Sequence, residues 1–223
     1  MLVVNGAGSV LAQGVISRWR DGPVLALSRG AVINQANVRS VNIASHDEYE
    51  EVLGQVDGER VIWVNFQTLK LDKLVTDVTA VDLARSFEVN VFRNFLAARV
   101  LIPKMLRKKF GSFIFVDSVL AAMGVPGCSP YATSKAATRA LMKSIVAEYS
   151  RFGITCNTIG IGFADTPMFS TFKKEKKDSM LGAVPGKKFV EPSEVYDAIK
   201  FLVNTRSTNG QVLNLDGGLG MKG

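Results

Sequence analysis

Residues 129–137 read SPYATSKAA, and the segment VDSVLAAMG at residues 116–124 lies just before them. Tyr131 and Lys135 are four residues apart, so a helix brings both side chains to one face, one turn apart. An ammonium beside a phenol favours the phenolate, which predicts that Tyr131 exchanges its proton nearer neutral pH than a free tyrosine, whose pKa is about 10. Ser118, expected on a loop after a buried apolar run, could hold a carbonyl oxygen against that phenol. Taken alone, the pair is equally compatible with a chance spacing on a helix surface.

Length and composition indicate one globular domain. The chain has 223 residues, of which 47% are hydrophobic and 21% charged, enough for a sizeable core. No apolar run approaches the roughly 20 residues that span a bilayer, and the N-terminal MLVVNGAG lacks the pattern of a signal peptide. Cys128 and Cys156 make no disulfide framework, and no metal-ligand spacing occurs. We therefore expect a cytoplasmic protein with no membrane span and no metal site.

The chain is basic, with a formal net charge of +7. Basic residues concentrate at residues 107–110, 173–177 and 187–188. Such a surface attracts nucleic acid, anionic lipid or an acidic protein. No basic motif is interleaved with aromatic residues, so nucleic-acid binding is not expected. A solvated basic face with no partner is an equally good interpretation.

Apolar runs and helical segments alternate along the whole chain. Strands are predicted at residues 2–4, 23–27, 38–43, 59–65, 111–117, 154–159 and 211–215. Helices are predicted at residues 10–20, 45–56, 78–109 (as one or two helices), 130–152 and 192–204. Residues 166–184 are expected to be irregular. This alternation predicts an α/β fold of Rossmann type, a doubly wound parallel sheet of about seven strands with helices on both faces.

Two features near the N-terminus point to a dinucleotide. The glycine-rich NGAGSVLAQG at residues 5–14 joins the first strand to the first helix, where backbone N–H groups can approach a pyrophosphate. An ordinary tight turn is the alternative. The residue that closes the second strand meets the adenosine ribose, where an acid selects NAD and an arginine accommodates the 2′-phosphate of NADP. Ser28 and Arg29 stand there, which favours NADPH.

These motifs resemble the short-chain dehydrogenase/reductase family over essentially the full chain. Asn90 in FEVNVF, Ser118, and Tyr131 and Lys135 in YATSK match the family's catalytic signature. Further matches are GITCNTIGIGFADTPM, EPSEVYDAIKFLV and GQVLNLDGG. The resemblance implies a single NAD(P)-binding domain at residues 1–223, with a small substrate lid around residues 163–190.

The resemblance also implies a mechanism. Ser118 and Tyr131 hold the carbonyl oxygen, and Tyr131 delivers the proton while the nicotinamide offers a hydride. Lys135 orients the nicotinamide ribose and stabilises the phenolate. Asn90 holds a water that links Lys135 to solvent.

The chain departs from the family most at the cofactor's phosphate end. The usual T-G-x-x-x-G-x-G is NGAGSVLA at residues 5–12, so only Gly6 keeps its place, and Val10 adds a side chain where backbone usually approaches phosphate. The usual N-N-A-G is NFQT at residues 65–68, and the segment between strands two and three is short. The cofactor-binding residues implied are Gly6, Ser9, Val10, Leu11, Ser28, Arg29, Asn42, Ile43, Asn65, Tyr131, Lys135, Gly162, Ala164 and Thr166.

Three functions follow from the resemblance. The first is an NADPH-dependent reductase of a 3-oxoacyl thioester, bound to coenzyme A or to an acidic acyl carrier protein that docks on Lys108, Lys109 and Arg151 and on the basic lid. The second is a dehydrogenase/reductase of a small free alcohol or ketone. The third is a non-catalytic nucleotide-binding subunit. The family pairs its long helices across a two-fold axis, which implies a homodimer or homotetramer with Ala132, Ala136, Ala137 and Ala140 at the contact.

Overall fold

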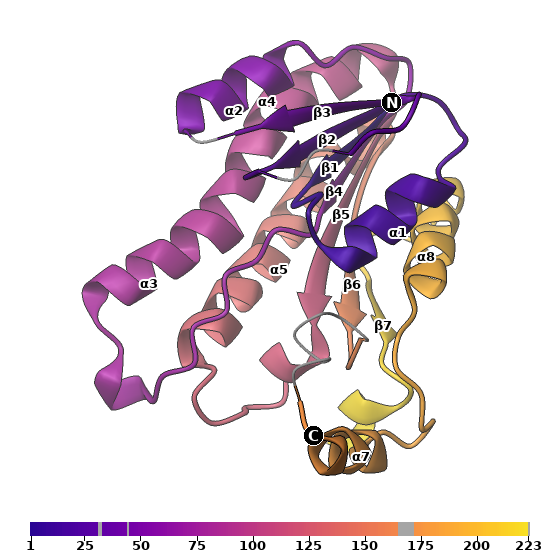
Figure 1. The fold of residues 1–223 in the computed structure, drawn as a ribbon. Coiled ribbons are helices and arrows are strands. Elements are labelled where there is room, and N and C mark those ends of the chain that lie inside the picture. Colours follow the sequence, from indigo (N-terminus) through magenta and orange to yellow (C-terminus); the bar gives the residue numbers. More distant parts are fainter. Residues whose placement is uncertain (31–32, 44, 165–171, 223) are drawn as a thin grey trace.

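A computed structural model gives the fold and describes residues 1–30, 33–43, 45–164 and 172–222 (Figure 1). Seven strands form one sheet in the order β3-β2-β1-β4-β5-β6-β7, and all neighbouring pairs are parallel. The strands are β1 (Leu2–Asn5), β2 (Val24–Ser28), β3 (Val38–Asn42), β4 (Val61–Asn65), β5 (Gly111–Ser118), β6 (Ile154–Ile161) and β7 (Val212–Leu215). The predicted fold class is confirmed.

Helices cover both faces of this sheet. They are α1 (Val10–Arg18), α2 (His46–Gly54), α3 (Ala80–Phe87), α4 (Arg93–Lys108), α5 (Ser129–Tyr149), α7 (Lys174–Ala183) and α8 (Pro192–Asn204). In Figure 1, α1 and α8 lie on one face, and α2, α4 and α5 lie on the other. Each layer has its own core: Trp19 and Ile199 belong to the first, and Tyr49 and Met105 to the second. The central strands are therefore buried on both faces, which explains their continuous apolar runs.

Local sequence signals set the helix starts. The Ser9 side chain caps α1 by accepting a hydrogen bond from the Ala12 N–H at 3.1 Å. Ser45 and Glu48 form a capping box at the start of α2, and Pro192 is the first residue of α8. Gly14 lets α1 and α8 approach closely, because a Cβ there would lie 2.2 Å from Cβ of Pro192.

One expectation about the helices needs correction. Residues 174–183, predicted to be irregular, form helix α7; Lys and Glu are good helix formers, although α7 buries no side chain. Residues 165–171 lie outside the described part. Pro103 lies inside α4, but the interruption of the long helical stretch comes earlier, at the π-helix η2 (Glu88–Phe92). A π-helical turn inserted between α-helices is often found at a functional site.

The topology determines where a ligand can bind. The chain order of the strands reverses between β1 and β4, and in open parallel sheets ligands bind at such a switch point, beyond the carboxyl ends of the strands. The described part of the segment between β2 and β3 contains no helix, as predicted, so the pocket is less covered beside β2. Among the described helices, none combines the length and apolar character that a bilayer crossing requires.

Candidate active site

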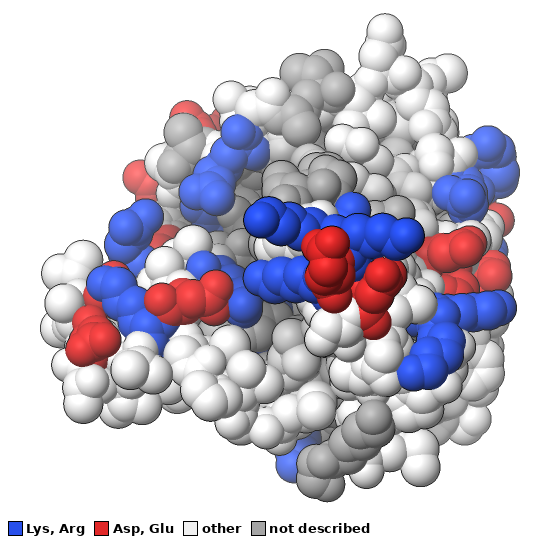
Figure 2. Space-filling view, turned by 60° about the horizontal axis from the view of Figure 1, so that its bottom comes forward, with Lys and Arg blue, Asp and Glu red and all other residues white. Residues whose placement is uncertain are grey.

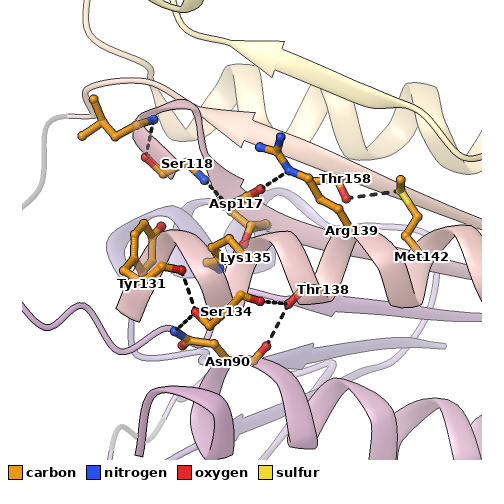
Figure 3. A network of polar contacts seen from close by, with 12 residues as sticks. Asn90, Asp117, Ser118, Tyr131, Ser134, Lys135, Thr138, Arg139, Met142 and Thr158 are labelled. Carbon is orange, nitrogen blue, oxygen red and sulfur yellow. Dashed lines mark hydrogen bonds and ion pairs between the residues drawn. The ribbon is translucent and has the colours of Figure 1, made fainter. Parts of the chain in front are cut away.

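Helix α5 presents a row of three polar side chains to the end of β5 (Figure 3). Tyr131, Lys135 and Arg139 follow one another at intervals of four residues and therefore share one face. The Lys135 Nζ donates to the backbone carbonyl of Val116 at 2.9 Å. The Arg139 Nε donates to Oδ2 of Asp117 at 2.7 Å. The Tyr131 phenol lies near the Ser118 hydroxyl and under the Lys135 ammonium, so the structure brings Ser118, Tyr131 and Lys135 together.

The electrostatics of Tyr131 differ from the sequence prediction. Burial raises the pKa of this phenol above 10, and the carboxylate of Asp117 raises it further, while the nearby hydroxyls of Ser118 and Thr68 act in the opposite direction. The prediction that Lys135 moves the Tyr131 pKa toward neutral is therefore wrong in this structure. Desolvation of the phenol is the largest cause of this rise, and Lys135 is itself buried, which lowers its own pKa. Tyr131 is thus a protonated group, ready to donate.

Asn90 connects three elements around this cluster. It lies in η2, and its side-chain amide pairs with the backbone of Leu69, accepting from N at 2.7 Å and donating to O at 2.9 Å. The same amide donates to Oγ of Ser134 on α5 at 2.9 Å. Asn90 therefore fixes the loop after β4, which carries Thr68 toward Tyr131. The water relay from Lys135 through Asn90 stays a prediction.

A pocket of about 530 Å³ opens beside this loop at the switch point. Its walls come from the β1–α1 turn, the end of β2 and the loop after β4. The lining residues are Gly6, Gly8, Ser9, Ser28, Arg29, Phe66, Gln67 and Thr68. Gly6 has φ of +77°, and a Cβ there would lie 2.4 Å from the backbone N of Gln67, so only glycine lets the turn pack against the loop.

The other residues expected around the cofactor are more dispersed. Val10 and Leu11 occupy the first turn of α1, directly after Ser9, and do not line the pocket. Asn42 ends β3 with an exposed side chain, whereas the Ile43 side chain is buried in the core beside Tyr49.

The Asn65 side chain is hydrogen-bonded within the protein. It is buried, and its Oδ1 accepts from Nδ2 of Asn5 at 2.8 Å and from the backbone N of Gln67 at 3.0 Å. Asn65 thereby fixes the turn that leads to the pocket.

Two of the three cofactor residues expected after β6 are described, and they lie between the end of that strand and the part of the predicted lid that is outside the described residues. The Gly162 N–H donates to the carbonyl of Leu215 at 2.8 Å, and Ala164 pairs with Val190. Thr166 lies outside the described residues.

Several residues of the site are absent from the sequence prediction. Gly8, Phe66, Gln67 and Thr68 line the pocket, and Asp117 and Arg139 flank the cluster. Arg139 had a readable signal, since it continues the Tyr131–Lys135 spacing by one more turn. Gln67 and Thr68 had none, because they stand where the family pattern has small residues.

The pocket fits a dinucleotide on grounds of its own geometry. It combines the switch point, a glycine turn that a Cβ would fill, and the N-terminus of α1, whose unpaired N–H groups favour an anion. Gly6, Gly8 and Ser9 would hold the phosphates, and Ser28 and Arg29 the adenosine ribose.

Comparisons with known proteins agree with this description. The family described as Enoyl-(Acyl carrier protein) reductase matches residues 28–220. The 3-oxoacyl-[acyl-carrier-protein] reductase FabG of Thermotoga maritima is 30% identical over 184 residues, which cover 80% of this chain and 75% of that protein. The FabG of Vibrio cholerae is 29% identical over 192 residues, covering 85% and 75%.

Solved structures show the same fold. The ligand-free aldohexose dehydrogenase of Thermoplasma acidophilum superposes with a TM-score of 0.87 at 23% identity, covering 100% of this chain and 94% of that one. ElxO with NADP bound gives a TM-score of 0.86 at 19% identity, covering 98% and 97%. At these identities the likeness establishes the architecture alone.

A parallel sheet with a dinucleotide-sized pocket beside a Ser–Tyr–Lys cluster defines a nicotinamide-dependent oxidoreductase. The chain belongs to the short-chain dehydrogenase/reductase family, whose members bind NAD(P)H, and it is similar to the 3-oxoacyl reductases within it. It is accordingly an NAD(P)-dependent oxidoreductase that acts on CH–OH or keto groups.

Proposed function

We propose that the chain reduces a 3-oxoacyl thioester to the 3-hydroxyacyl form with NADPH, using Tyr131 as the general acid. The observation that carries this proposal is the buried Tyr131 near Ser118 and Lys135, beside the nucleotide-sized pocket. The 30% identity to a 3-oxoacyl reductase supports the substrate class.

The roles follow from the contacts of each side chain. When bound, the nicotinamide cofactor supplies the hydride. Ser118 and Tyr131 orient the carbonyl oxygen, and Tyr131 gives it a proton as negative charge develops there. The buried ammonium of Lys135 then stabilises the phenolate across 5.5 Å to the ring centroid. Asn90 keeps the loop after β4 in place.

The preference for NADPH rests on the end of β2. Arg29 is exposed and lines the pocket directly after the last residue of that strand. A guanidinium there is suited to a 2′-phosphate, and the described residues offer no carboxylate in the pocket lining to hold a ribose hydroxyl instead.

An apolar cluster that includes the neighbour of Ser118 favours an acyl substrate over a sugar. Val119, which follows Ser118, forms a small buried cluster with Val184 and Leu219, and Phe163 and Met123 pack against it. This cluster provides apolar surface next to Ser118, where a polyhydroxy substrate would need hydrogen-bonding partners instead.

The basic residues suggest where an acidic carrier protein would dock. Figure 2 shows Lys and Arg side chains gathered over α7, where Lys174 and Lys176 are exposed. The other predicted docking residues lie elsewhere than α7: they adjoin the starts of β5 and β6 and are Lys108, Lys109 and Arg151. They lie about 20 Å from Ser118 along the strand, so on a single chain α7 is the better docking surface.

Pairing through α4 and α5 is the proposed route to a homo-oligomer. A groove of about 660 Å³ between them is lined by Ala98, Ala137, Ala140 and other apolar residues. Phe95 beside it is 58% exposed, which is costly for an isolated chain. Sedimentation of the wild type should give a dimer or tetramer, and Phe95→Glu should give monomers.

One set of assays separates the candidate functions. Purified protein is mixed with NADPH and, in turn, an acetoacetyl thioester of an acyl carrier protein, the coenzyme A thioester, a crotonyl thioester and a simple cyclic ketone. Our proposal predicts the fastest NADPH oxidation with the acetoacetyl thioesters. Preference for the free ketone would support the small-metabolite alternative, and preference for the crotonyl thioester would indicate enoyl reduction. NADPH titration without any turnover would support a non-catalytic subunit.

A further inference from the structure

An ion pair lies directly behind the reaction centre. The carboxylate of Asp117, whose side chain is 3% exposed, is bonded to the Arg139 guanidinium, whose side chain is 26% exposed, at 2.7 Å. Asp117 is the residue immediately before Ser118, and its Oδ1 accepts from the Ser118 backbone N–H at 2.7 Å. One carboxylate therefore joins the strand that carries Ser118 to the helix that carries Tyr131 and Lys135 (Figure 3).

The surroundings show why the charge of this carboxylate matters. Lys135 lies one turn before Arg139 on α5 and bonds the carbonyl of Val116, the residue before Asp117. Two cations thus flank one buried carboxylate. Facing Asp117 on β6 is Gly160, which has no charge. Cys128 and Thr68 complete the polar groups around Tyr131.

We propose that Asp117 and Arg139 act as a positioning pair for the reduction. Asp117 fixes the backbone of Ser118 and favours the charged form of Lys135, and Arg139 keeps the Asp117 carboxylate in place. This proposal rests on the proposed function. The carboxylate favours protonated Tyr131 and protonated Lys135, and Arg139 disfavours protonated Lys135. The pair is therefore expected to set the alkaline limit of reduction, above which the proton donor is lost.

Substitutions of Asp117 and of Arg139 should shift the pH at which kcat begins to fall in opposite directions. Asp117→Asn keeps the shape and the acceptor for Ser118 but removes the negative charge, so kcat should begin to fall at a pH about one unit lower than in the wild type. Arg139→Gln removes a cation near Lys135, so the fall should begin at a higher pH. Arg139→Lys restores the charge and should return the limit toward the wild type.

The substitution of Asp117 should also affect kcat much more than KM. Asp117→Asn should lower kcat about tenfold or more at neutral pH, because it weakens the charged bond to Arg139 that joins the strand of Ser118 to the helix of Tyr131. KM should change much less, since neither residue is expected to touch the substrate. Lys143→Gln, which removes an exposed charge one turn beyond Arg139, is the matched control and should leave the whole profile unchanged.

The experiment is the pH dependence of kcat for acetoacetyl thioester reduction in these variants. Opposite shifts for Asp117→Asn and Arg139→Gln support the proposal. Coincident limits, or shifts in the same direction, would overturn it and leave a merely structural ion pair. If Asp117→Asn does not fold, the double variant Asp117→Asn/Arg139→Gln, in which both partners are neutral, serves instead. Its kcat should begin to fall at a lower pH than that of the wild type. An unshifted pH limit would refute the proposal. An inactive wild type would refute the proposed function first.

Discussion

Lys135 lies over the ring of Tyr131, with its Nζ 5.5 Å from the ring centroid, and donates its hydrogen bond to the backbone of Val116. The ammonium therefore faces the ring of Tyr131 without bonding to its hydroxyl, and both side chains are buried. Burial lowers the pKa of Lys135 and raises that of Tyr131, so each group departs from its ordinary value in the direction that desolvation dictates.

Replacing Lys135 with methionine should separate stability from catalysis. The pKa of Lys135 is lower in the folded chain than its ordinary 10.5, so between these two values the unfolded chain binds more protons and stability rises with pH. Wherever Lys135 is protonated, its buried ammonium opposes folding, because burial disfavours the charged form. Lys135→Met should therefore unfold at the same or a higher temperature, lack that rise, and lose most reductase activity.

Thermal unfolding followed across neutral and alkaline pH checks this prediction. A variant that is less stable than the wild type at neutral pH would contradict it, because it would show that the ammonium contributes net stability.

Asn90→Ala should loosen the loop after β4. Three hydrogen bonds to Leu69 and Ser134 are lost, and buried backbone groups are left unpaired, which costs roughly 2 kcal/mol or more. Hydrogen exchange at the Leu69 amide should accelerate well beyond that in the core of β4. Asn94→Leu is the control: it removes the hydrogen bond from the Asn94 Nδ2 to the backbone carbonyl of Asn90 at 2.9 Å but keeps the Asn90 side chain, so Leu69 should stay protected.

Gly6→Ala should weaken cofactor binding and the fold together. Its Cβ would meet the backbone of Gln67 at 2.4 Å, and its φ of +77° strains any residue with a side chain. We expect the NADPH dissociation constant, measured by fluorescence titration, to rise at least about tenfold, or 1.4 kcal/mol. Gly54→Ala, where a Cβ meets nothing within 4 Å, should stabilise the chain by about 0.5–1 kcal/mol and leave binding unchanged.

Arg29→Ala tests the cofactor preference. If Arg29 meets the 2′-phosphate, the variant should lose about tenfold in NADPH affinity, the equivalent of one charge-assisted contact, and keep its NADH affinity. Arg39→Ala, another exposed arginine, controls for the change in net charge. Equal losses for NADPH and NADH would contradict the assignment.

The sequence predicts the architecture well because strand and helix periods alternate clearly from Leu2 to Leu215. The four-residue spacing predicts that Tyr131 and Lys135 share one face of a helix, and the family resemblance adds Ser118 to them. The sequence does not predict the high pKa of Tyr131, which depends on burial and on Asp117, a tertiary neighbour. Helix α7 was missed because its lysines show no apolar period, and Thr68 because nothing local indicates that it reaches Tyr131.

The most direct test of the account is turnover by Tyr131→Phe. The substitution removes one hydroxyl and keeps the ring, so the fold and NADPH binding should persist while kcat for acetoacetyl thioester reduction falls by about 10²–10⁴-fold. The 3-hydroxyacyl product, followed together with NADPH oxidation, should appear with the wild type and be nearly absent with the variant. Comparable rates for the two proteins would contradict the assignment of Tyr131 as the proton donor.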